Sequence, residues 1–171
     1  MAESKKDKSR IRAVSAADNE IGQERFELYK AAFSWISNAI DNGYYLEAIS
    51  IEESLISDRL ESYLSFLKDE DFSFKTLGNL IDAFRSKESK ADELLRSIVI
   101  DKVDSWRKRR NIAAHEMVKI EDGKNINWAD RVKINQDIAR DGLELVREIN
   151  GQVRKVRSKN ALPNNRNAPE L

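Results

Sequence analysis

The segment YYLEAISIEESLISDRLESYLSFLK, residues 44–68, repeats large apolar side chains at intervals of three, four and seven residues. This spacing follows the period of an α-helix, about 3.6 residues per turn, and places the apolar side chains along one face. They are Tyr45, Ile49, Ile56, Leu60, Tyr63 and Leu67. The segment therefore predicts a long amphipathic helix that must bury this face against other elements.

The same spacing predicts four more helices around this segment. The first begins at a capping Asp or Asn at residue 18 or 19 and ends at the turn-like sequence DNG, residues 41–43. The others are expected at about 74–84, 95–117 and 128–157. The 6 glycines are isolated and both prolines follow residue 160, so few strong helix breakers interrupt these segments.

A chain of 171 residues, 40% of them hydrophobic, is long enough to build one domain with its own core. We expect a single all-α domain at 18–157, folded as an antiparallel bundle of four to five helices. Residues 1–17, rich in Lys, Arg, Ser and Ala, are expected to form a disordered basic arm, and residues 158–171 a disordered tail.

Charge and composition limit the classes of function. The formal net charge is +0, so attraction to nucleic acid or to an anionic membrane must be local if it exists. The absence of cysteine excludes a disulfide framework, a thiolate nucleophile and a sulfur metal site. No stretch approaches the roughly 20 apolar residues of a membrane span, and no apolar segment follows the basic N-terminus. We expect a cytoplasmic protein that does not enter a membrane.

Most enzyme templates are missing from the sequence. It has no Gly-rich phosphate loop, and its isolated glycines do not form a dinucleotide fingerprint. His115 and Glu116 begin like a zinc-protease motif, but Lys119 stands where the second histidine should be. One histidine without cysteine would need unusual carboxylate ligation to hold zinc within one chain. We expect no metal and no cofactor, and any chemistry should centre on His115, although a Ser–His–Asp arrangement stays open.

The stretch WRKRRNIAAHEM, residues 106–117, combines four consecutive cations with the only histidine of the chain. At about 100° per residue, Arg110 lies about 40° from the apolar stripe that includes Trp106, so it must be paired or line a cleft. Asn111 and His115 share a face nearly opposite that stripe and should be exposed or cover an interface. Arg110 and His115 are about 140° apart, too far to act together on one phosphate unless the helix bends or ends between them. A second chain offers another solution.

Glu53 is the predicted partner of Arg110. It falls about 40° from Ile49, at the margin of the apolar face, whereas Glu52 and Arg59 lie further round the helix. A bidentate ion pair between Glu53 and Arg110 would neutralise both. The alternative is that Glu53 extends into water.

Arg110 and Asn111, followed after three residues by His115, resemble the Arg–polar–x–x–x–His signature of HEPN-domain ribonucleases, an all-helical family. The segment AISIEESLISDRL, residues 48–60, is similar to the second helix of that family, with Glu53 in its apolar run. The resemblance covers residues 18–157 and implies a HEPN-like bundle.

The resemblance also implies RNA cleavage without a metal, in which a 2′-hydroxyl attacks the neighbouring phosphate and leaves a 2′,3′-cyclic phosphate. This reaction needs a base for the 2′ proton and an acid for the departing 5′-oxygen, and His115 suits either role. Arg110 would stabilise charge on the phosphate, and Asn111 would position His115 or a phosphate oxygen. Because each chain has one histidine, we expect a two-fold homodimer with a composite active site; the resemblance implies that it forms across this helix.

Basic side chains beside the motif are the predicted RNA-binding residues, because such patches attract phosphates. They are Lys102, Arg107, Lys108 and Arg109, and a second cluster is Arg147, Arg154, Lys155, Arg157 and Lys159. The alternative is that these cations only solubilise the surface. Trp35, Tyr44 and Trp128 suit base stacking, but aromatic residues on helices more often pack in cores.

The leading hypothesis is an endoribonuclease of the kind used as a toxin or abortive-infection effector in antiviral defence, with RNA as substrate and an antitoxin or regulatory protein as a further partner. The alternative is a non-catalytic HEPN-like module that binds a protein or a nucleotide. In that case Arg110 is a structural ion-pair partner and His115 an interface residue.

Overall fold

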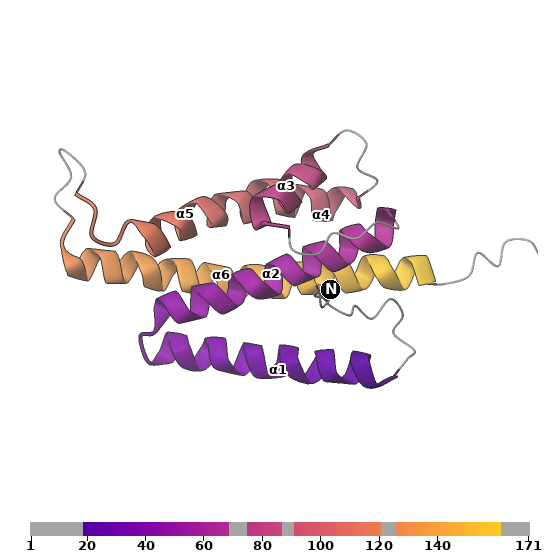
Figure 1. The fold of residues 1–171 in the computed structure, drawn as a ribbon, viewed down its shortest axis with the longest axis horizontal. Helices are drawn as coiled ribbons and strands as arrows, with labels where there is room; N and C mark the ends of the chain where they lie inside the picture. Colours follow the sequence, from indigo (N-terminus) through magenta and orange to yellow (C-terminus); the bar gives the residue numbers. More distant parts are fainter. Residues whose placement is uncertain (1–18, 69–74, 87–90, 121–125, 162–171) are drawn as a thin grey trace, which may run out of the picture.

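The computed structural model describes residues 19–68, 75–86, 91–120 and 126–161, and these residues form a helical bundle (Figure 1). The predicted all-α fold class is confirmed. The long helices are α1, Asn19–Asp41, α2, Tyr45–Lys68, and α6, Trp128–Ala161. The shorter elements are α3, Leu77–Arg85, α4, Glu93–Ser97, the π-helical segment η1, Ile98–Val103, and α5, Asp104–His115.

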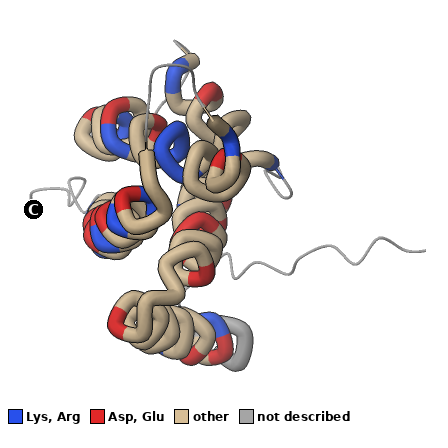
Figure 2. The backbone as a smooth tube through the Cα atoms, turned by 90° about the vertical axis from the view of Figure 1, so that its left-hand side faces the viewer, with Lys and Arg blue, Asp and Glu red and all other residues tan. Residues whose placement is uncertain are grey.

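Helix α2 lies at the centre of the bundle. It packs most extensively against α6, with α1 on another side and α3 and α5 on a third. Helices α1 and α2 run in opposite directions, as do α5 and α6 (Figure 1). Helix α1 lies at the edge of the bundle and contacts mainly α2 (Figure 2). The position of α2 means that residues on several of its sides become buried.

A tight turn joins α1 to α2 at the predicted DNG sequence. Gly43 adopts a φ of 82°, a conformation that glycine enters without steric cost. The N–H of Tyr44 donates to the carbonyl of Ala39 at 2.7 Å, and that of Gly43 donates to Ile40 at 3.2 Å. This pair of bonds is the Schellman pattern, so the end of α1 is determined by its own sequence.

The predicted helix at 95–117 is not a single α-helix. It consists of α4, η1 and α5, and it ends at His115, two residues before the predicted end. The π-helical turns of η1 are wider than α-helical turns and rotate the residues that follow them. Ile98, Val99 and Val103 are all buried in this segment. Apolar spacing does not reveal such a segment, because the residues on either side keep a helical period.

Helix α3 begins three residues later than predicted. Thr76 caps it, since its hydroxyl oxygen accepts a hydrogen bond from the N–H of Asn79 at 3.2 Å. The predicted start at residue 74 lies outside the described residues.

The predicted C-terminal boundary also moves. Helix α6 continues to Ala161, so the first four residues of the expected tail, 158–161, are helical. The rest of that tail and the expected arm at 1–17 lie outside the described residues. In the described part of the chain, no helix has an apolar stretch long enough to cross a membrane.

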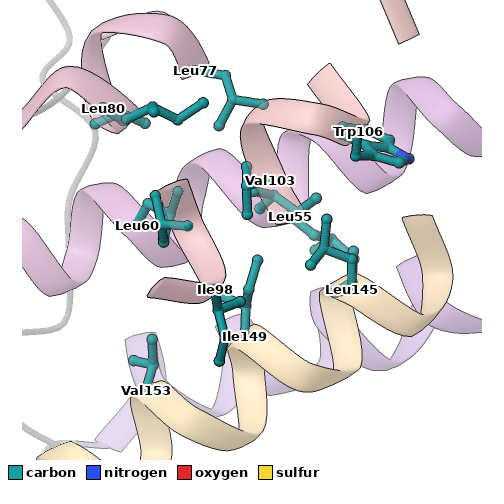
Figure 3. Packing of buried hydrophobic residues seen from close by; sticks show 14 of the residues in the cluster. Leu55, Leu60, Leu77, Leu80, Ile98, Val103, Trp106, Leu145, Ile149 and Val153 are labelled. Atoms are coloured by element: carbon teal, nitrogen blue, oxygen red, sulfur yellow. The ribbon is translucent and has the colours of Figure 1, made fainter. Parts of the chain in front are cut away.

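The core joins the apolar faces of all the helices, and Figure 3 shows the part of it to which α2, α3, η1, α5 and α6 contribute. Its buried side chains include Leu55, Leu60, Leu77, Leu80, Ile98, Val103, Trp106, Leu145, Ile149 and Val153. Most residues of the predicted stripe on α2 are buried, among them Ile49, Ile56 and Leu60. Phe26 of α1, by contrast, is 60% exposed, because α1 packs mainly against α2 and the rest of its surface is largely uncovered by the described residues.

Glu52 corrects the prediction for α2, which placed it away from the apolar face. Its side chain is 0% exposed and lies where α2, α5 and α6 meet. A Cβ atom at Gly142 would overlap the Glu52 carboxyl group and lie 2.8 Å from Trp106 Nε1, so only glycine permits this approach. Neither Glu52 oxygen has a hydrogen-bond partner in the described structure. Burial raises the pKa of Glu52 to about 9, and the charge of Asp141 adds to this effect.

Replacing this carboxyl group should change how stability depends on pH. Between the ordinary glutamate pKa of about 4.5 and about 9, folded Glu52 keeps a proton that the unfolded chain has lost. Rising pH therefore destabilises the fold, by up to about 1.4 kcal/mol per pH unit in this window. We expect Glu52→Gln to flatten this slope in urea unfolding measured from pH 5 to pH 8. Glu144→Gln, at an exposed site on α6, should keep the wild-type slope; an unchanged slope in Glu52→Gln would contradict the burial argument.

Candidate active site and its ion pairs

Arg110 projects from α5 towards α2 and is held there by two neighbours. Its Nη2 forms an ion pair with Oε1 of Glu53, and its Nη1 donates a hydrogen bond to Oδ1 of Asn111 at 2.9 Å. The Arg110 side chain is 15% exposed and that of Glu53 30%. The predicted pairing of Glu53 with Arg110 is confirmed, but it is formed by one nitrogen and one oxygen and is not the predicted bidentate pair. Burial lowers the pKa of Arg110, but an arginine remains charged at neutral pH.

The pair lies on the wall of a groove of about 640 Å³ between α2, the start of α3, and α5. Hydroxyl, amide and charged side chains line much of it: Ser50, Glu53, Ser54, Ser57, Glu61, Lys75, Thr76, Arg107, Arg110 and Asn111. Such a lining can bind a phosphodiester through the cations and a sugar through the hydroxyls. The groove is large enough for a nucleotide-sized group.

The groove contains residues that the sequence analysis missed. Ser50, Ser54, Ser57 and Glu61 follow one another at intervals of four, three and four residues, so they form a polar stripe on α2. That spacing was visible in the sequence. On an amphipathic helix, however, a polar stripe normally faces water. This stripe lines a groove only because α3 and α5 pack beside it, which the spacing on α2 does not reveal.

His115 is the last residue of α5 and is exposed. It is not among the residues that line the groove, so the described chain does not bring it together with Arg110. The chain after it is fastened to α6, because Arg131 donates to the carbonyls of Glu116 at 2.8 Å and Lys119 at 2.5 Å. The exposure predicted for His115 is confirmed, and α5 continues as one helix from Arg110 to His115. Asn111, predicted to share an exposed face with His115, is instead half-buried and lines the groove with Arg110.

All four predicted RNA-binding cations have carboxylate partners. The pairs are Lys102 with Glu148 at 2.6 Å, Arg109 with Asp141 at 2.5 Å, and Arg107 and Lys108 with Asp104 at 2.8 and 2.9 Å. Figure 2 shows the same intermixing of basic and acidic residues along the helices. The run of cations is therefore not an uncompensated positive patch.

Asp104 is the shared partner in this cluster. Its side chain is 4% exposed, and it also accepts a hydrogen bond from Arg85 of α3 at 2.7 Å. Hydrogen bonds from Lys108 first, and also from Arg107 and Arg85, hold the pKa of Asp104 well below its usual range. Asp104 thus ties α3 to α5 beside the groove.

The second predicted basic cluster lies along α6 and is mostly exposed. Arg157 is the exception: it donates hydrogen bonds to the backbone carbonyl and the hydroxyl of Ser62, at 2.7 and 2.8 Å. Its guanidinium also lies over the ring of Phe66. Arg157 therefore joins α6 to α2. The other four cations, Arg147, Arg154, Lys155 and Lys159, are exposed.

Exposed apolar side chains gather where α5 ends and α6 begins, next to His115 in the sequence. We call them the apolar tip: Ile112, Val118, Ile120, Ile126, Trp128 and Ile134. Val118 and Ile120 are 85% and 93% exposed. Ile112, Ile126 and Ile134 also line a small cavity of about 70 Å³. Exposed apolar patches of this kind mark interaction surfaces more often than scattered single residues do.

Trp35, Tyr44 and Trp128 differ from the expectation that they pack in the core. They are 57%, 64% and 63% exposed, respectively. Trp35 lies on the edge helix α1 and Tyr44 in the turn that follows it, where no further helix of the described part of the chain covers them.

Within the described ranges, no group of three or more His, Cys, Asp or Glu residues is placed to hold a metal ion. The chain matches no protein-family model, no curated protein and no solved structure.

Asp104→Asn tests whether the basic run stabilises the fold. It removes a buried charge and leaves three cations around a neutral group, so we expect a loss of about 2–4 kcal/mol in the free energy of unfolding at pH 7. Asp141→Asn, at the more exposed pair with Arg109, should cost under about 1 kcal/mol. The cost of Asp104→Asn should shrink as pH falls below about 3.8. Below that pH the unfolded wild type gains a proton on Asp104 that the folded wild type does not yet bind, which destabilises the wild type. Equal losses for both variants in urea unfolding would count against this role.

Proposed function

We propose that the protein is a metal-independent endoribonuclease that acts as a homodimer. The observation that supports this most directly is the setting of Arg110, ion-paired with Glu53, hydrogen-bonded to Asn111 and exposed to a groove that accommodates a phosphodiester. A fixed guanidinium at such a wall stabilises negative charge as it develops on a phosphate. The resemblance of Arg110, Asn111 and His115 to the Arg–polar–x–x–x–His signature of HEPN ribonucleases supports the same chemistry.

The proposed reaction needs only proton transfers. The 2′-hydroxyl loses its proton to a neutral imidazole of His115, and its oxygen forms a bond to phosphorus. The bond to the 5′-oxygen breaks, and an imidazolium supplies the proton to that leaving group. Arg110 balances the charge of the phosphate, and Asn111 keeps the guanidinium in place. The products are a 2′,3′-cyclic phosphate and a 5′-hydroxyl.

A second copy of the chain supplies what one chain lacks. In a single chain His115 does not line the groove, and one histidine cannot be base and acid in the same step. The apolar tip beside His115 gives a two-fold interface a surface to bury. Such an interface assembles the composite site from two Arg110, two Asn111 and two His115 side chains.

A non-catalytic binding module is the second candidate, and one observation favours it. The pairing of Lys102, Arg107, Lys108 and Arg109 with carboxylates removes much of the positive charge that RNA binding uses. In this reading Arg110 holds α5 against α2, and the apolar tip binds another protein. For the nuclease, we propose a cytoplasmic role in toxin or antiviral defence, with an antitoxin or regulatory protein as partner.

RNA cleavage in EDTA separates the two candidates. We expect the wild type to cleave total RNA or tRNA and leave 2′,3′-cyclic phosphate ends, and His115→Ala to lower the rate by roughly 10²–10⁴-fold. Ser105→Ala, at another exposed position of α5, should cleave normally. Thermal unfolding of each variant checks that the fold survives, because His115 is exposed and its loss should not move the Tm. Equal cleavage by wild type and His115→Ala, or no cleavage by either, would reject the nuclease.

Mixed dimers test the composite site. When wild-type chains are refolded with an excess of His115→Ala chains, activity per wild-type chain should fall severalfold, because most wild-type chains then share a site with only one histidine. Mixing the two folded proteins without exchange of subunits is the control and should leave the activity unchanged. Constant activity per wild-type chain after refolding would show that each chain carries a complete site.

A further inference from the structure

The corner between α1 and α2 contains a second pocket, of about 320 Å³, which shares no lining residue with the groove. It is lined by Trp35, Asn38, Ala39, Asn42, Tyr44 and Glu47. Its two aromatic side chains are more than half exposed, although aromatic residues normally dominate buried surfaces. The pocket thus presents two large π surfaces to solvent within one small hollow.

A hydrogen bond and a tight turn position the two aromatic residues of the pocket. Trp35 Nε1 donates a hydrogen bond to Oε1 of Glu47 at 2.7 Å, which orients the indole across the gap between α1 and α2. Tyr44 follows Gly43 directly, so the Schellman turn that ends α1 also determines where its ring begins. A preorganised aromatic pair loses little conformational entropy when a ligand binds.

The polar groups of the pocket leave acceptors open. Oε1 of Glu47 takes the indole N–H, while its Oε2 accepts no hydrogen bond within the described residues. Asn42 uses its Nδ2 on the carbonyl of Asn38 at 2.8 Å, which leaves its Oδ1 free in the same part of the structure. The pocket therefore offers flat apolar surfaces next to unused oxygen acceptors. A matching ligand has a flat face and N–H donors at its edge.

We infer that this pocket binds one unpaired nucleobase, stacked on Trp35 or Tyr44, with its N–H groups donated to Glu47 and Asn42. Bases stack on aromatic side chains in proteins that bind single strands, and a base carrying N–H donors meets the open acceptors. Guanine fits best, because its N1–H and its amino group are adjacent donors, one for each of the two open acceptors, Oε2 of Glu47 and Oδ1 of Asn42.

The inference rests on the proposed function in one respect, which is that the base belongs to RNA in the groove. Glu47 of the pocket lies three residues before Ser50 of the groove, a rise of about 4.5 Å along α2. A strand that places a phosphate near Arg110 can therefore reach the pocket with a neighbouring base. The substrate would have to be single-stranded there, because a paired base cannot enter the pocket.

A cationic ligand is the rival occupant, since aromatic rings beside a carboxylate also hold methylated ammonium groups. One oxygen of Glu47 is already engaged by the indole, and the open amide oxygen of Asn42 favours a ligand that donates N–H groups. The two ligands are distinguished by direct binding.

The three tryptophans of the chain provide the measurement, because each gives one indole N–H signal in an NMR spectrum of ¹⁵N-labelled protein. GMP should shift the Trp35 signal and leave those of buried Trp106 and exposed Trp128 in place. Tyr44→Ala should weaken GMP binding by about tenfold, the size expected for a stacking aromatic. Trp128→Ala, at a comparably exposed aromatic, should leave it unchanged. A Trp35 signal that does not respond to GMP, or responds to tetramethylammonium at lower concentration, would overturn the inference.

Glu47→Gln tests the edge contacts separately from the stacking. It should weaken binding of GMP and leave purine riboside monophosphate, which lacks both donors, unaffected; equal effects on the two ligands would reject the edge contacts. GMP binding requires no cleavage, so His115→Ala should retain it. GMP binding without RNA cleavage would support the base-binding pocket and reject the nuclease. RNA cleavage without GMP binding would support the nuclease and reject the base-binding pocket.

Discussion

The close approach of α2 and α6 at Gly142 is the contact on which the rest of the arrangement depends. Glu52 and Trp106 occupy the space that a side chain at this position would need. Trp106 also donates its indole N–H to the carbonyl of Ile138 at 3.0 Å, which attaches α5 to α6. Once α5 is attached in this register, Arg110, one helical turn after Trp106, faces Glu53 of α2. The position of the candidate site is thus a consequence of core packing.

This contact includes a buried carboxyl group without a hydrogen-bond partner among the described residues. Burying a charged carboxylate in an apolar environment is too costly, so Glu52 remains protonated at neutral pH. The protonated group fills the space between three helices almost as an apolar side chain would. Such a core loses stability as the pH rises and the Glu52 carboxyl group tends to ionise. The protonated side chain still provides the surface against which α5 packs.

The charges of the molecule are arranged as local pairs. Asp104 gathers cations from α3 and α5, and Asp141 and Glu148 of α6 pair with two more cations of the basic run. These pairs attach η1 and α5 to their neighbours and leave little long-range positive field. Recognition of a charged ligand must then come from a few placed groups, chiefly Arg110 at the groove, and from the shape around them. The pocket between α1 and α2 offers aromatic surfaces, and stacking on such surfaces does not depend on charge.

The sequence by itself determined the elements and one contact. Apolar spacing revealed the long helices, Gly43 located the turn after α1, and the helical angles of Arg110 and Glu53 indicated their pairing and the outward direction of His115. These features depend on residues close together in the chain, or on the rule that a charge at the edge of an apolar stripe needs a partner. Only the tertiary structure decided the burial of Glu52, the π-helical segment before α5, the neutralisation of the basic run, and the exposure of Trp35 and Tyr44. Each of these features depends on which helices pack against a given residue. The apolar spacing of one helix does not reveal that α2 is covered by several helices and α1 mainly by α2.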